Sequence, residues 1–306
     1  MLWLIAAVSA YLILAVVSLT DKWLLVGPIP SPKTYIFYIG TLQIFALFLI
    51  PLTGFVIPGP FQIFLALASG ALFVFGLYWF FKGLHLFEPS RIVPAVGGLV
   101  PIFSFLFIFI FSGGQETIAL KDFLAFLLLV AGSVLLTWER SQKLSWASIK
   151  ISLIAAVLIA LSFVSAKYVY LEQTFWSGFI WIKAGSFLAS MFFLFLFGKE
   201  ILAEVFKKKE AVARKKTTVV FLLNQGAGAG GNILQNWAIA LAPLAYVAFI
   251  NALQGVQYAF LLILTIFFSL KLPRLFKEEI SREIIFQKVI AILIIGGGLA
   301  ILALNL

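Results

Sequence analysis

Three polar side chains in one apolar segment have the spacing of a helical face. Tyr78, Lys82 and His85 are separated by four and then three residues, and side chains at these spacings lie on one side of a helix. Lys82 could balance the charge of an anionic ligand, with Trp79 beside it as an apolar wall. At the end of such a segment, His85 is more often an interfacial residue than a proton relay.

A second set of polar side chains lies in the other half of the chain. Gln225, Asn232 and Asn236 fall at positions i, i+7 and i+11, again on one helical face. The sequence GAGAGG at 226–231 leaves little side-chain bulk around this face, and Trp237 could supply an apolar wall. The next apolar segment adds three candidates on one side: Asn251, Gln254 and Tyr258. An unsatisfied polar group is costly in hydrocarbon, so we expect these groups to face one another, water or a ligand.

Lys183 is the candidate that packing explains least well. It lies about eight residues inside an apolar segment, where a lipid-exposed charge would cost about 3 kcal/mol. Lys82 and Lys167, by contrast, lie near segment ends and could extend their amines to water. Any single Asn or Gln could simply hold helices together. Three polar groups aligned over eleven residues exceed that need, which favours a ligand site.

The carboxylates of these segments are distributed differently. All lie at or beyond segment ends: Asp21, Glu88, Glu116, Asp122 and Glu172. Carriers that expel cations against protons usually need a carboxylate inside the bundle to hold either ion in turn, so that mechanism is disfavoured. The ionisable groups closest to the interior are lysines, which favours a ligand that carries a carboxylate or a phosphate.

The composition identifies the setting of these side chains. Of 306 residues, 63% are hydrophobic and 11% are charged, whereas soluble domains are about 25% charged. The apolar runs are long enough to cross roughly 30 Å of hydrocarbon. The sequence therefore predicts an all-α integral membrane protein whose surroundings are a lipid bilayer.

Several classes of function are disfavoured by what the sequence lacks. The net charge of +10 comes from short connectors without a recognition motif, so we expect no nucleic-acid partner. With no cysteine, there is no thiolate chemistry, and the single histidine and scattered carboxylates have no metal-ligand spacing. We expect no cofactor or metal. No phosphate-binding loop of the Walker type is present, so ATP is not the direct energy source.

Apolar runs bounded by charge or proline predict ten membrane-spanning helices. They cover approximately residues 2–20, 34–52, 61–84, 90–112, 120–138, 147–169, 175–197, 218–241, 243–270 and 284–305. The first run lacks the basic start of a signal peptide and is interpreted as the first span. The connectors are short, so no separate soluble domain is expected.

Two segments repeat at a constant offset of 154 residues, 81–103 and 235–257. In both, a helix ends at a proline-initiated turn and a second helix begins at once. The offset places Lys82 on Asn236 and Tyr78 on Asn232. The duplication is typical of carriers built from two related halves.

The polar stretch after five spans separates the two halves, as residues 1–138, a linker at 139–146, and residues 147–306. With an odd number of spans per half, the second half must cross in the opposite sense, which gives a 5+5 inverted repeat. Connectors after the odd-numbered spans contain or adjoin 19 of the 22 Lys and Arg residues. Because positive residues are retained inside, this count predicts that both termini face outward.

The chain resembles EamA-like carriers of the drug/metabolite transporter superfamily over essentially its whole length. EPSRIVPAVGGLVPIFSFLF at 88–107 is similar to the fourth span of that family, and GGQETIALKDFLAFLLLVAGSVLL at 113–136 to its Glu-containing loop and fifth span. The second half keeps LAPLAYVAFINAL at 241–253 and GGGLAIL at 296–302, although Gly255 stands where the first half has Pro101.

The resemblance implies alternating access around a central cavity lined mainly by spans one to four and six to nine. It also implies cytoplasmic termini, contrary to the charge count. Gly132 and Gly296–Gly298 are typical of close helix packing, which allows a homodimer without requiring one.

The preferred hypothesis is a plasma-membrane secondary transporter that exports a small polar or anionic metabolite, such as an amino acid, an organic acid, or a phosphorylated or nucleotide-linked compound. The expected binding residues are Tyr78, Trp79, Lys82, Lys183, Gln225, Asn232, Asn236, Trp237, Asn251, Gln254 and Tyr258. The alternative is a membrane enzyme acting on a lipid-linked substrate, but His85, Glu88 and Arg91 lack a nucleophile or ligand partner for that chemistry. We therefore expect a carrier and not an enzyme.

Overall fold

The computed structural model describes residues 1–26, 31–87, 89–116, 118–138, 145–205, 211–271 and 282–304. Within these ranges, all regular structure is helical. Nine of the helical segments described there are long and apolar enough to cross a membrane, so the chain is a multi-pass membrane protein. The helix that contains Asn232 and Asn236 is not among the nine, because its polar face and glycines lower its hydropathy.

Serine, proline and glycine mark the ends of several helices in the first half of the chain. Ser31 begins one helix by accepting a hydrogen bond from the amide of Thr34, with proline at the next position, and Pro60 begins another. Gly54 ends a short helix with a φ of 63°, a left-handed conformation that glycine adopts easily. The elements are α1 (Leu2–Val26), α2 (Pro32–Leu42), the 3-10 helix η1 (Gln43–Leu49), α3 (Ile50–Thr53), α4 (Pro60–Leu86), α5 (Pro89–Phe111) and α6 (Leu120–Thr137).

The second half contains the longest helices. Ser145 caps the first of them by accepting from the amide of Ser148 at 3.2 Å. The elements are α7 (Trp146–Glu172), α8 (Phe175–Val205), α9 (Ala211–Leu241), the 3-10 helix η2 (Leu244–Tyr246), α10 (Val247–Ala252), α11 (Gln254–Lys271) and α12 (Arg282–Leu304).

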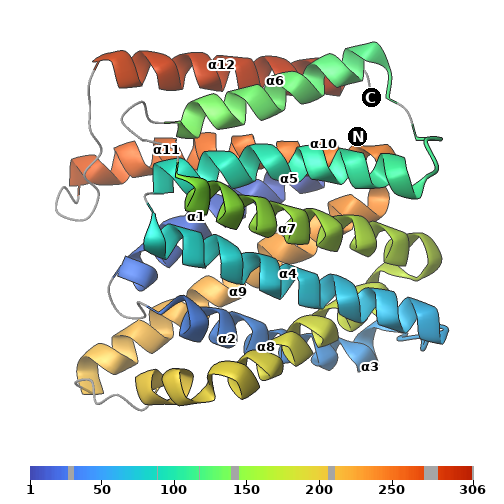
Figure 1. The fold of residues 1–306 in the computed structure, drawn as a ribbon, viewed down its shortest axis with the longest axis vertical. Helices are drawn as coiled ribbons and strands as arrows, with labels where there is room; N and C mark the ends of the chain where they lie inside the picture. The colour runs from blue at the N-terminus through green and yellow to red at the C-terminus, as the bar shows by residue number, and fades with distance from the viewer. Residues whose placement is uncertain are drawn as a thin grey trace.

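The helices form a bundle in which α6 and α12 lie together at one edge, and α2 and α8 lie at the opposite edge (Figure 1). Between these edges, α1 packs against α9 and α11, while α4 packs against α7 and α8. Helix α5 contacts α7 and α10. The largest buried apolar cluster extends across α1, α5, α7 and α10, so the central helices share one core.

Glycines allow the closest helix crossings. A Cβ atom at Gly70 would lie 1.9 Å from the carbonyl oxygen of Ile182, and one at Gly185 would lie 2.2 Å from that of Leu67. Helices α4 and α8 therefore touch backbone to backbone. Gly132 similarly faces Ile295 where α6 crosses α12. The homodimer stays a prediction.

Seven predicted spans agree with the described helical segments within a few residues, and the predicted helices at 2–20, 175–197 and 218–241 are longer in the structure. The span predicted at 34–52 is divided into α2, η1 and α3. Thr41 and Gln43 bond the carbonyls of Phe37 and Ile39 there, and such side-chain bonds compete with the helical ladder.

The span predicted at 243–270 is also divided, into η2, α10 and α11. The hydroxyl of Tyr11 donates to the carbonyl of Ile250 at 2.7 Å, close to the break between α10 and α11. A side chain inserted into the helical hydrogen-bond ladder is a common cause of such breaks.

Candidate functional site

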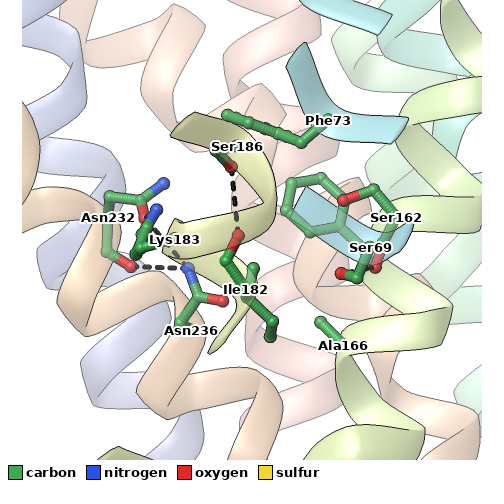
Figure 2. A pocket seen from close by; sticks show the side chains of 10 residues that line it. Ser69, Phe73, Ser162, Ala166, Ile182, Lys183, Ser186, Asn232 and Asn236 are labelled. Carbon is green, nitrogen blue, oxygen red and sulfur yellow. Dashed lines mark hydrogen bonds between the residues drawn. The ribbon is translucent and has the colours of Figure 1, made fainter. Parts of the chain in front are cut away.

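A small cavity lies among α4, α7, α8 and α9 (Figure 2). Its volume is about 10 Å³, which is room for about one water molecule. The lining residues are Ser69, Phe73, Ser162, Phe163, Ala166, Ile182, Lys183, Ser186, Asn232 and Asn236. The cavity is therefore too small for a metabolite in this structure.

The cavity lies deep inside the bundle. Ser69, Ser162, Lys183 and Asn232 each lie eight to ten residues from one end of their helix, or about 12–15 Å at the rise of an α-helix. The ends in question are the first turns of α4 and α8 and the last turns of α7 and α9. They lie on the same side of the bundle, because the amine of Lys167 near the end of α7 reaches the end of α9, and the amide of Val56 just before α4 reaches Ser177 at the start of α8. Half of a hydrocarbon core is about 15 Å, so at this depth the cavity lies well inside the membrane-spanning part of the bundle.

Lys183 and Asn232 join two of the surrounding helices. The side-chain amine of Lys183 on α8 donates to Oδ1 of Asn232 on α9 and lies 4.9 Å from the ring centre of Phe179. Lys183 is only 5% exposed. Because a lysine ammonium can only donate, the Asn232 atom that faces it must be the amide oxygen.

Asn236 and Tyr170 continue this hydrogen-bond network. Nδ2 of Asn236 donates to the side-chain oxygen of Asn232 at 3.1 Å and to its carbonyl at 2.9 Å. The hydroxyl of Tyr170 on α7 donates to Oδ1 of Asn236 at 2.9 Å. The side-chain oxygens of both amides are thus already used by protein donors.

What remains in this cluster is an excess of donors. The Lys183 ammonium has three N–H groups and uses one of them on Asn232, and the amide nitrogen of Asn232 has two more. No carboxylate belongs to the cavity lining as far as the chain is described. Such a cluster can bind an oxygen that accepts several hydrogen bonds and carries negative charge.

Serine hydroxyls line other parts of the cavity. Ser69 on α4 donates to the carbonyl of Ser162 on α7 at 2.9 Å. Ser186 on α8 donates to the carbonyl of Gly70 on α4 at 3.1 Å and lies 3.3 Å from that of Ile182. These bonds connect the helices across the cavity wall.

The residues predicted from the first half, Tyr78, Trp79 and Lys82, do not line this cavity. The amine of Lys82 lies 4.5 Å from the ring centre of Trp79 and 5.9 Å from that of Tyr78. The Tyr78 ring in turn packs against Phe193 on α8. The lysine and two aromatic residues form a separate cation–π group.

The remaining predicted residues of the second half are also apart from the cavity. Nδ2 of Asn251 donates to Ser104 at 2.7 Å, and the Tyr258 ring lies against Gly97. The partly buried side chains of Gln225 and Gln254 are not among those that line the cavity. Trp237 is 43% exposed on α9. Of the eleven predicted residues, the cavity brings together Lys183, Asn232 and Asn236.

Lys167 is bound inside the protein. It is 3% exposed, and its amine donates to the carbonyls of Ala240 at 3.0 Å and Ala242 at 2.6 Å. These carbonyls end α9, where the helix leaves backbone acceptors unpaired and a cation is favourable. The expectation that Lys167 extends to water is wrong.

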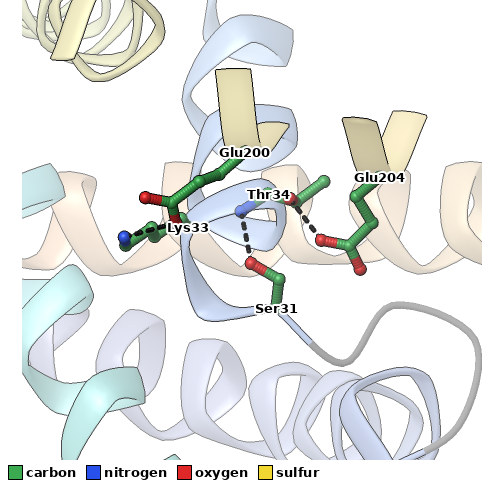
Figure 3. Close-up of polar contacts among 5 residues, drawn as sticks. All are labelled: Ser31, Lys33, Thr34, Glu200 and Glu204. Carbon is green, nitrogen blue, oxygen red and sulfur yellow. Dashed lines mark hydrogen bonds and ion pairs between the residues drawn. The ribbon is translucent and has the colours of Figure 1, made fainter. Parts of the chain in front are cut away.

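Polar contacts also join the helices on the other side of the bundle. Lys33 on α2 pairs with Glu200 on α8 at 2.6 Å, and the hydroxyl of Thr34 donates to Glu204 at 2.6 Å (Figure 3). Nearby, Asp21 accepts hydrogen bonds from Tyr35 and, at 2.6 Å, from Asn224. Asp21 lies at the end of the first membrane-spanning segment, as expected, although the helix α1 itself continues to Val26. Its carboxylate is bonded between helices.

Four residues of this site were not predicted from the sequence: Tyr170, Ser69, Ser162 and Ser186. None of them has a spacing that distinguishes it from the other polar residues of an apolar helix. Of the three residues considered for enzyme chemistry, His85, Glu88 and Arg91, Glu88 lies outside the described residues.

No protein-family model and no curated protein matches the sequence. A solved structure described as "Crystal structure of protein" is similar in fold, with a TM-score of 0.65 and 17% sequence identity. The similarity covers 99% of this chain and 96% of that chain. At this identity, it shows that the helical fold of the whole chain is one that other proteins share.

Proposed function

We propose that the protein is a secondary carrier that moves a small anionic or polar metabolite across the cell membrane, outward, by alternating access. The observation that carries this proposal is Lys183. It is a buried amine beside a cavity deep in the helix bundle, where the described residues supply a neutral amide and no carboxylate partner. Ionisable residues inside a membrane bundle are costly, and they usually mark a ligand or ion pathway.

The helix pairing supports a carrier made of two inverted halves. In the proposed 5+5 division, α1 and α7 are the first helices of the two halves, and α4 and α9 are the third. Each first helix packs against the third helix of the opposite half, α1 on α9 and α7 on α4. The second spans of the two halves also pack against each other, α2 against α8, and so do the fifth spans, α6 against α12. Such an exchange of partners is the pattern that a pseudo-two-fold axis would generate.

The small size of the cavity also fits this proposal. A carrier passes through a state in which neither side has access to the bound ligand. Tyr170 and Lys167 join α7 to the end of α9 on one side of the cavity, while Asp21, Tyr35 and Asn224 join α1, α2 and α9 on the other. Each set of bonds would break as its own side opens.

Counterflow in proteoliposomes tests the proposal. The protein should exchange labelled small carboxylates or phosphates across the membrane, and Lys183→Met should slow this exchange by about 10- to 100-fold, the loss expected for a hydrogen bond to a charged group. Lys121→Met is the matched control, because Lys121 is exposed at the start of α6. Transport of a lipophilic cation that Lys183→Met leaves unchanged would contradict the proposal.

A further inference from the structure

The serine hydroxyls give the cavity a second kind of polar surface. A hydroxyl has one proton to donate and two lone pairs to accept. Ser69 and Ser186 use their protons on the backbone carbonyls of Ser162 and Gly70. Both residues are buried, at 0% and 2% exposure, so water does not compete for these bonds. The hydroxyl oxygens therefore offer the cavity acceptors.

The cavity thus has two chemically opposite parts. Figure 2 shows Lys183, Asn232 and Asn236 on one side and Ser69 and Ser162 on the other. The first part presents donors and positive charge, while the hydroxyl oxygens of Ser69 and Ser186 present acceptors. Apolar side chains complete the lining: Phe73, Phe163, Ala166 and Ile182. A ligand that satisfies both parts needs an anionic group and a separate hydrogen-bond donor.

We propose, on the basis of the carrier function above, that the site takes a short hydroxy monocarboxylate. Its carboxylate accepts hydrogen bonds from Lys183 and from the amide nitrogen of Asn232. Its hydroxyl donates to the oxygen of Ser69 or Ser186. The cavity has room for about one water, so a wall must move to admit any ligand, and a short ligand requires the smallest movement.

Two neighbouring ligand classes fit less well. The second carboxylate of a dicarboxylate has no proton to donate and would face the acceptor oxygens of the serines. The ammonium of an amino acid could donate to the serines, but it would share a small, weakly screened cavity with Lys183. The described lining residues include no carboxylate to offset that repulsion. A neutral hydroxyl avoids both costs.

Matched substrates separate these possibilities in the reconstituted protein. We expect lactate to be exchanged about tenfold better than propionate, which lacks only the hydroxyl, because one hydrogen bond contributes about that factor. Lactate should also exceed succinate and alanine. Ser69→Ala and Ser186→Ala should move the lactate-to-propionate ratio towards one. A ratio measured within each variant does not depend on how much of the protein folds.

Ser190→Ala is the control for these variants. Ser190 lies one turn beyond Ser186 on α8, is buried, and donates to the backbone carbonyl of Phe187 at 2.9 Å, but it does not line the cavity. This variant should keep the lactate-to-propionate ratio of the original protein. Equal exchange of lactate and propionate, or a preference for succinate or alanine, would overturn the hydroxy-acid proposal and leave the carrier function standing. Exchange of no anion at all would overturn both.

Discussion

The amine of Lys183 on α8 donates a hydrogen bond to Oδ1 of Asn232 on α9, deep in a bundle of membrane helices. A buried ammonium usually requires a negative partner, and here the described chain supplies a neutral amide. The pair therefore joins two helices, and in the proposed carrier an anionic ligand would supply the countercharge. The first prediction concerns that missing charge.

Asn232→Asp should place a carboxylate of the protein beside Lys183, where the anionic ligand is proposed to bind. The new carboxylate would lie beside Lys183, so we expect thermal stability in detergent to be retained or raised, while anion exchange falls by at least about tenfold. Asn251→Asp provides the contrast. Asn251 is 1% exposed and bonds Ser104, not a lysine, so its carboxylate would be buried without a cation and should destabilise the protein. Equal melting temperatures for the two variants would contradict this account of Lys183.

The crossing of α4 and α8 predicts a cost for any side chain at Gly185. In Gly185→Ala the new methyl group would lie 2.2 Å from the carbonyl oxygen of Leu67, so the helices must separate. We expect a loss of about 1–3 kcal/mol in unfolding free energy. Gly198, on the same helix, has no atom within 4 Å of its Cβ position. Gly198→Ala should therefore change stability by less than about 1 kcal/mol. Thermal unfolding of both variants checks the difference.

Tyr35 and Tyr168 should respond differently to loss of the hydroxyl. Tyr35 donates to the carboxylate of Asp21, so Tyr35→Phe removes one of its donors and should cost about 1.5–3 kcal/mol. The hydroxyl of Tyr168 is buried without a partner among the described residues. Tyr168→Phe should consequently leave the unfolding free energy unchanged or raise it. A larger loss in Tyr168→Phe than in Tyr35→Phe would show that the Asp21 contact contributes little.

The orientation in the membrane can be measured with introduced cysteines, because the chain has none of its own. Gln115 lies in the connector between α5 and α6, and Glu210 lies in a basic connector. If the charge distribution decides orientation, an impermeant thiol reagent applied to intact cells should label Gln115→Cys and spare Glu210→Cys. The reverse labelling would place both termini in the cytoplasm, as the resemblance to EamA-like carriers implies.

Much of the helical organisation follows from sequence, because an apolar run long enough to cross a membrane must satisfy its backbone internally. Serine and proline at Ser31–Pro32 and the proline at Pro60 also mark helix starts. Periodicity places Asn232 and Asn236 on one helical face, and the structure has them hydrogen-bonded to each other. The depth of Lys183 within its segment likewise indicates a buried amine.

Which helical faces meet was decided only by the tertiary structure. Lys82 and Lys183 were both expected at a ligand site, but the amine of Lys82 lies over Trp79, whereas that of Lys183 reaches Asn232 on another helix. Ser69 became a cavity residue because the close crossing of α4 and α8 brings it there. Periodicity determines which residues share a face within one helix. The rotation and separation of neighbouring helices depend on how all their side chains pack together, and no single segment contains that information.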